Sequence, residues 1–179
     1  MHDINRPHTP DETTADFLYK TYLLLRTAPP SFSKWARQLG LESVASCANS
    51  WRVIGITETA LREIAAAGER TNQQRGHWYP REHRYSALFG ENSQDMDRDA
   101  FIKFFFDHDT TVIVTKAQNN KNGDHSTWGR IILVPEGLFP LSGYSFGVRV
   151  KTEMPWVRAR MAELDAGAVG TALVTDGAS

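Results

Sequence analysis

Apolar residues recur with two different spacings along the chain, and the spacing changes near residue 110. Before that point they return every three or four residues, which is the period of a helix packed against a core. After it they form short β-branched or aromatic runs between turn residues, which is typical of strands. The pattern therefore predicts a helical first half and a β-rich second half.

Start and stop signals delimit the first three predicted helices. The first begins at Asp11 or Thr13 and ends before the prolines at 29 and 30, where a helix cannot continue. A second is expected from Ser31 to Gly40, with glycine at its end, and a third over 43–53. The residues of the first helix predicted to face inward are Phe17, Leu18, Leu24 and Leu25.

Three more helices are predicted before residue 110. The clearest has Thr57 as its cap and Gly68 at its end. The next covers 80–90, with Pro80 in its first turn and Gly90 at its end. The last covers 95–109, with Asp97 as its cap. Between them, the polar segment 69–79 is predicted to be irregular.

Three apolar runs in the second half predict a β-meander, that is, antiparallel strands that follow one another along the chain. The runs are "TTVIVTK", "GRIILVP" and "YSFGVRVK", and a final helix with Pro155 in its first turn follows them. Helices and strands in separate blocks predict the α+β class. The expected organisation is a flexible arm, 1–12; a single α+β domain, 13–165, made of a helical part, 13–108, a β-meander, 110–151, and a final helix, 154–165; and a tail, 166–179.

Composition narrows the cellular setting without identifying a partner. The chain has 179 residues, 41% hydrophobic, and a formal net charge of −1. No apolar run approaches the roughly 18 residues that a membrane span needs, and the polar start does not resemble a signal peptide. The single cysteine, Cys47, cannot form an internal disulfide, as suits a reducing compartment. We therefore expect a cytoplasmic protein without membrane insertion.

The charge is distributed in blocks of opposite sign. Residues 70–84 hold four arginines and one glutamate, whereas 91–109 hold six acidic and two basic residues. The basic block interleaves Arg70, Arg75, Arg81 and Arg84 with His77, Trp78, His83 and Tyr85. Arginine holds phosphates by forked hydrogen bonds, and aromatic rings stack on bases, so the block is a candidate nucleic-acid site. The alternative is a helix whose arginines pair with the acidic block.

A second candidate site is the loop 116–128, between two predicted strands. Val112, Val114 and Lys116 should share one face of the strand, and Ile113 and Thr115 the other. The loop then offers amides, hydroxyls and an imidazole, from Gln118, Asn119, Asn120, His125, Ser126 and Thr127. Such groups suit phosphate binding or acid–base cleavage of a phosphodiester. The alternative is an ordinary hairpin loop, which uses the same residue types.

Other site classes are weakly indicated. "DHD" at 107–109, "DH" at 124–125 and the pair His77 and His83 lack the close, repeated spacing of a zinc site, so no metal site is predicted. No P-loop, dinucleotide-binding glycine motif or G-x-S-x-G turn occurs, and no cofactor is predicted. "WARQLGLESVAS" fits a helix-turn-helix poorly, because a polar residue, Ser46, falls where an apolar one is expected.

One family resemblance adds to these observations. "GER" at 68–70 resembles the G-E-R-R box of the ParB/sulfiredoxin superfamily, with Thr71 in place of the second arginine. The layout of 55–160 is similar to plasmid fertility-inhibition proteins of the Osa type, which belong to that superfamily. The resemblance implies a protein that blocks conjugative transfer of other plasmids, with nuclease activity associated with the group. It carries over Glu69 and Arg70 as nucleotide- or DNA-site candidates.

These observations predict a nucleic-acid-associated, nuclease-like protein that inhibits conjugative plasmid transfer. His77, His125 and Lys116 are the predicted catalytic residues. The predicted nucleic-acid-binding residues are Glu69, Arg70, Arg75, Arg81, Arg84, Trp78, Asn119 and Asn120. Two alternatives stay open: an inhibitor without catalysis that docks on a protein of the conjugation apparatus through Trp78, Tyr85 and the arginines, and a metal-independent ribonuclease. All versions assume that the arginines and the 116–128 loop meet over one anionic pocket.

Overall fold

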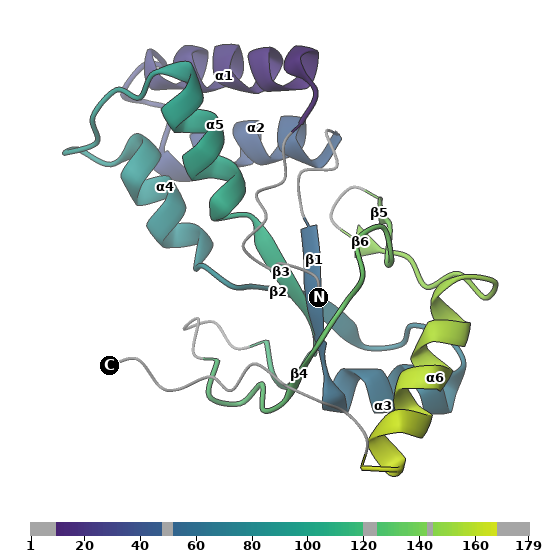
Figure 1. Ribbon diagram of the computed structural model, residues 1–179. Coiled ribbons are helices and arrows are strands. Elements are labelled where there is room, and N and C mark those ends of the chain that lie inside the picture. Colours follow the sequence, from purple (N-terminus) through teal and green to yellow (C-terminus); the bar gives the residue numbers. More distant parts are fainter. Residues whose placement is uncertain (1–9, 48–51, 120–124, 143–144, 168–179) are drawn as a thin grey trace.

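The computed structural model describes residues 10–47, 52–119, 125–142 and 145–167 (Figure 1). Within these residues it contains helices and a mixed sheet, which agrees with the predicted α+β class. The helices are α1 (Glu12–Arg26), α2 (Lys34–Cys47), α3 (Glu58–Ala67), α4 (Arg81–Phe89), α5 (Arg98–Asp107) and α6 (Glu153–Asp165). The strands are β1 (Arg52–Thr57), β2 (Gln73–His77), β3 (Thr110–Thr115), β4 (Ile131–Leu133), β5 (Leu141–Ser142) and β6 (Ser145–Phe146).

The predicted β-meander is wrong, because β3 and β4, the first two strands of the second half, do not pair with each other. The main sheet has the order β2-β3-β1-β4, so β1 lies between β3 and β4. β1 runs parallel to β3 and antiparallel to β4, while β2 is antiparallel to β3. The run "YSFGVRVK" contributes only β6, which pairs with β5 in a separate small sheet. The helical half thus supplies two of the four main strands.

The separate helix predicted over 43–53 is wrong, because 43–47 belong to α2 and residues 52 and 53 begin the central strand β1. Its sequence, "RVIGIT", is rich in β-branched residues, and positions 53–57 are all buried. A strand buried on both faces has a continuous apolar run, which periodicity does not distinguish from a short buried helix. Helix α2 also passes through Gly40 and ends only at Cys47, so the predicted end at Gly40 is wrong. Ser33, not Ser31, accepts a hydrogen bond from the first turn of α2.

Several helix boundaries are confirmed by their caps. Asp11 accepts a hydrogen bond from the Thr14 N–H at the start of α1. Thr57 caps α3 in the same way, and Gly68 ends that helix in the left-handed conformation, at φ 74°. Asp97 caps α5. These polar groups satisfy helix-end N–H donors that otherwise have no partner, so their signals are local and readable from sequence.

Four helices form a layer at one end of the sheet (Figure 1). Helices α1, α2, α4 and α5 enclose an apolar cluster of aromatic and aliphatic side chains. At its centre the rings of Tyr22 and Phe101 stack with centroids 4.5 Å apart. Leu18 is fully buried there as predicted, but Phe17 and Leu24 are 61% and 70% exposed, which contradicts their predicted inward orientation. They lie about 100° around the helix from the buried Leu18 and the partly buried Leu25.

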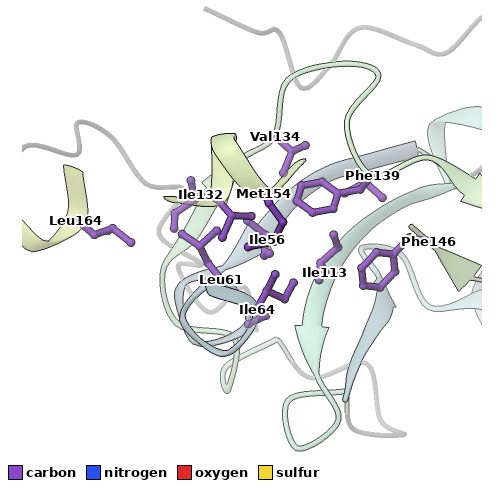
Figure 2. Close-up of a cluster of buried hydrophobic side chains, with 13 residues drawn as sticks. Ile56, Leu61, Ile64, Ile113, Ile132, Val134, Phe139, Phe146, Met154 and Leu164 are labelled. Carbon is purple, nitrogen blue, oxygen red and sulfur yellow. The ribbon is translucent and has the colours of Figure 1, made fainter. Parts of the chain in front are cut away.

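A second apolar cluster joins one face of the sheet to α3 and α6 (Figure 2). Ile56 and Ile113 come from the two parallel strands, Leu61 and Ile64 from α3, and Met154 from α6. All five side chains are buried. This cluster shows which face of the sheet is turned toward α3. We call that face the helix-covered face.

The opposite face of the sheet is covered by a loop and its tryptophan instead of a helix. Ile54, Val112 and Val114 pack there against Trp128. The predicted alternation along β3 is confirmed, because Ile113 belongs to the other cluster. Gly76 gives Trp128 its space, since a Cβ at that position would lie 2.6 Å from the indole ring. We call this the loop-covered face.

The predicted arm and tail lie largely outside the described residues. The final helix is confirmed as α6, with Pro155 in its first turn. Residues 1–9 of the predicted arm and 168–179 of the predicted tail lie outside the described ranges. Among the helices in the described ranges, none combines the length and apolar character that crossing a membrane requires.

Candidate functional site

The segment predicted to be irregular, 69–79, contains the edge strand β2, which distributes the candidate residues between two faces. In its antiparallel register, Arg75 lies opposite Ile113 and His77 opposite Thr111. Opposed residues of adjacent strands point to the same side, so Arg75 and His77 belong to the helix-covered face. Gln74 and Gly76 belong to the loop-covered face, opposite Val114 and Val112. The strand therefore separates the candidate residues physically.

Three arginines gather around His77 on the helix-covered side and a fourth, Arg70, lies near Arg75; we call these four the arginine cluster. Burial and the positive charges of Arg84, Arg81 and Arg75 lower the pKa of His77 well below its ordinary value. Burial likewise lowers the pKa of Arg75 to about 10, with Arg81 and Arg70 adding to the effect and Asp109 and Glu42 opposing it. The cluster thus comprises Arg70, Arg75, Arg81 and Arg84.

Two of these arginines are paired with buried carboxylates. Arg84 is 1% exposed and forms ion pairs with Asp109 and, at 3.7 Å, with Glu42. Arg81, whose side chain is 46% exposed, lies 3.2 Å from Glu42. Burial is the largest influence and disfavours the charged form of Arg84, but Asp109, Tyr85 and Glu42 together outweigh it and raise the pKa of Arg84. The prediction that Arg84 contacts nucleic acid is therefore wrong, because its guanidinium is enclosed and already compensated.

Arg70 occupies the exposed margin of the cluster. Its guanidinium lies over the Phe146 ring, 4.6 Å from the centroid, and donates to the Gln73 and Phe146 carbonyls and to Ser145. In the described part of the chain it has no ion pair with a carboxylate. Glu69 is exposed beside it. The stacking fixes the position of a cation that keeps its charge available to an anion.

The lowered pKa of His77 makes a prediction about stability. A histidine whose pKa is lower in the folded state than in the unfolded state binds protons preferentially when unfolded. Its contribution to stability is therefore complete above about pH 6.5 and is lost as the pH falls below that value. We expect the free energy of unfolding to decrease between pH 7 and pH 5, with a slope of up to about 1.4 kcal/mol per pH unit.

Urea unfolding at several pH values checks this expectation. His77→Gln should flatten the dependence between pH 7 and pH 5, because glutamine does not titrate. His83→Gln is the matched control, since His83 is exposed on α4. A slope that His77→Gln leaves unchanged would show that another group causes it.

On the loop-covered face, Gln118 organises the loop that follows β3. Its Oε1 accepts from Thr57 Oγ1 at 2.8 Å and from the Thr115 N–H at 3.1 Å. Its Nε2 donates to the Thr127 and Trp128 carbonyls, at 3.1 and 3.2 Å. The side chain is buried and its amide is fully used in these bonds. Gln118 therefore holds the loop in place and cannot also serve a ligand.

Three aromatic rings lie together beside this loop. His125 packs against Trp128, with centroids 4.0 Å apart, and against Trp78, at 5.4 Å. The Nε2 of His125 is 3.2 Å from the His77 carbonyl oxygen. Asn119 donates to Gln74 Oε1 at 2.8 Å. These side chains line the loop-covered face, so the imidazole of His125 is directed away from the arginine cluster.

The assumption of one shared anionic pocket is therefore wrong. His77 points to the helix-covered face, while His125 packs on the tryptophans of the opposite face. Lys116 is exposed and follows Thr115, at the other end of β3 from Thr111. Thr111 and Thr115 are four residues apart along the strand, which separates their backbones by about 13 Å. Predicted residue Asn120 lies outside the described ranges.

Sequence reasoning missed the carboxylates that organise the site. Glu42 and Asp109 are each 0% exposed, and both pair with Arg84. Asp109 fits the predicted alternative, in which arginines pair with the acidic block 91–109. Glu42 comes from α2, and no local pattern links it to α4. Tyr85 is also fully buried, so the predicted docking role of Tyr85 is wrong.

Neither a metal site nor a related protein identifies the function of this chain. Among the described residues, no group of three or more histidine, cysteine, aspartate or glutamate side chains is arranged to hold a metal ion. Comparison with protein-family models, with curated proteins and with solved structures finds no match to this chain. The functional argument therefore depends on the arginine cluster and its surroundings.

Proposed function

We propose that this protein binds the phosphate backbone of nucleic acid through the arginine cluster. The observation that carries the proposal is the convergence of three guanidinium groups on the neutral His77. Arg70 and Arg81 are the contacts we assign to phosphate, since both are exposed at the margin of the cluster. Arg75 adds positive potential between them. Arginine binds phosphate oxygens with two parallel hydrogen bonds, which suits this role.

The buried ion pairs support the proposed site by fixing its geometry. Arg84 connects α4 to Asp109, at the start of β3, and to Glu42, on α2. These contacts hold Arg81, three residues earlier on the same helix, next to β2. A charge fixed in advance loses less conformational freedom when it binds a ligand. In the proposal, Arg84 is a structural residue and its neighbours make the contacts.

The family resemblance suggests the biological use of such binding. A fertility-inhibition protein of the Osa type would use it to block conjugative transfer of other plasmids. For the nuclease-like activity that this resemblance implies, we propose His77 as the acid–base residue, because it lies within the arginine cluster. Its lowered pKa keeps the imidazole neutral at pH 7, which is the form that accepts a proton.

Removing the two exposed cations should weaken binding and reduce its dependence on salt. The double variant Arg70→Gln, Arg81→Gln is expected to bind a 20-nucleotide DNA about tenfold more weakly. The slope of log K against log salt should fall by about 1.5, because each phosphate contact releases counterions. Fluorescence anisotropy between 50 and 200 mM salt measures both quantities, and gels of the same samples report cleavage.

A matched control separates this site from the general charge of the protein. The double variant Lys151→Gln, Arg158→Gln removes the same charge from exposed positions next to and within α6. It should leave affinity and salt slope unchanged. Circular dichroism verifies that all variants are folded. Equal losses in both double variants, or binding that is insensitive to salt, would contradict the proposal.

A protein partner is the second candidate, and a different surface favours it. Large apolar side chains are exposed on α1 and α2 and on the loop between them: Phe17, Leu23, Leu24, Phe32, Trp35 and Leu39. Trp35 is 65% exposed, and aromatic residues of this kind often anchor protein interfaces. In this candidate function, a protein of the conjugation apparatus docks on the helical layer. Trp78 and Tyr85, the docking residues predicted from the sequence, are not part of that surface.

A further inference from the structure

The end of the edge strand β2 places one exposed aromatic ring, that of Tyr79, beside the arginine cluster. His77 is the last residue of β2, and the Trp78 N–H extends the ladder by donating to the Thr110 carbonyl at 3.0 Å. Tyr79 follows, and Pro80 then caps α4. Arg81 begins that helix. Two aromatic side chains therefore lie between the cations of Arg75 and Arg81 along the chain.

Tyr79 is the outer member of a row of three aromatic rings that meet at tilted angles. Its ring lies 4.7 Å from that of His108, and His108 lies 4.2 Å from Phe104 on α5. The His108 Nδ1 is 2.7 Å from the Phe104 carbonyl oxygen, which fixes the orientation of the imidazole. Tyr79 remains 42% exposed. A large ring is thus supported on its inner side and open to solvent on its outer side.

Trp78, the residue before Tyr79, lies on the loop-covered face and is directed away from the arginine cluster. It contacts His125 at 5.4 Å and Trp128 at 6.1 Å on the loop-covered face. Both Trp78 and His125 are half-buried. Because Trp128 is itself buried in the sheet cluster, the position of the Trp78 ring is determined by the core.

Cations beside an open aromatic ring favour one form of nucleic acid. In a duplex the bases are already stacked on one another, so a protein ring cannot reach their faces without opening the helix. In a single strand the base faces are available, and stacking adds to phosphate binding. We propose that the nucleic acid bound at the arginine cluster is single-stranded, with a base stacked on Tyr79. This inference rests on the proposed function.

Binding of a labelled 12-nucleotide oligo-dT and of a blunt 12-base-pair duplex tests the inference. The full chain should bind the single strand at least tenfold more tightly at the same salt concentration. Tyr79→Ala should weaken binding of oligo-dT about tenfold, with little effect on the duplex. Tyr79→Phe should retain the affinity, because phenylalanine keeps the ring.

Trp35→Ala is the matched control, since it removes an exposed aromatic residue from the helical layer. Its affinity for oligo-dT should equal that of the natural sequence. Equal binding of both probes, or unchanged affinity in folded Tyr79→Ala, overturns the inference while leaving phosphate binding intact. Absence of binding to either probe overturns the proposed function itself, so the two failures are distinguishable.

Discussion

Replacing Asp109 with alanine is expected to lower the free energy of unfolding by about 3–5 kcal/mol. Asp109 and Arg84 form an ion pair in which both side chains are fully buried. Without the carboxylate, the Arg84 guanidinium would stay buried with Glu42 as its ion-pair partner, 3.7 Å away. A buried charge that loses its partner keeps its desolvation cost without the compensating attraction. The loss should therefore exceed that of an ordinary surface pair.

Urea unfolding of paired variants separates the ion pair from simple loss of packing. Asp109→Ala and Arg84→Met should each be strongly destabilising. The double variant Asp109→Leu, Arg84→Met should recover much of the loss, because apolar side chains of similar size leave no charge unpaired. Glu82→Ala is the control, since it removes the exposed pair of Glu82 with Lys34 and should barely change the midpoint. If the double variant were as unstable as the sum of the single ones, the pair would not be coupled.

This ion pair also illustrates what the sequence could and could not predict about the fold. The first residues of α1, α3 and α5 were predictable, because the side chains of Asp11, Thr57 and Asp97 accept hydrogen bonds from N–H groups three residues later. The sheet order was not predictable in the same way. β1 pairs with β3 across more than fifty residues of chain, and only the tertiary structure brings them together. The β-branched content of 52–57 was the available signal.

The candidate site was predicted in its composition but not in its geometry. Arg70, Arg75, Arg81 and His77 do gather on one side of β2. Lys116 and His125 were assigned to the same site because their loop is close to β3 in sequence. Side chains alternate along a strand, however, and an irregular assignment for 69–79 concealed which face each residue would occupy. Recognising β2 as a strand would have separated His77 from Trp78.

Replacing Gln118 with leucine is expected to lower the free energy of unfolding by about 3 kcal/mol. Leucine has a similar size, so little cavity forms, but it offers no hydrogen bonds. The Thr57 hydroxyl and the Thr115 N–H would lose their acceptor, and the Trp128 carbonyl its Gln118 donor. Each buried polar group left without a partner costs roughly 1 kcal/mol or more.

Urea unfolding of Gln118→Leu alongside Asn119→Ala tests this role. Asn119 is half-buried and makes one amide–amide bond, to Gln74 at 2.8 Å, so its removal should cost only about 0.5–1.5 kcal/mol. Near-ultraviolet circular dichroism should also change in Gln118→Leu, because the Trp128 Nε1 donates to the Gln118 carbonyl at 3.0 Å. If the two variants were equally stable, the loop would be held by its tryptophan and not by the buried amide. The predicted difference arises because one side chain bridges β3, the end of β1 and the 127–128 backbone at once.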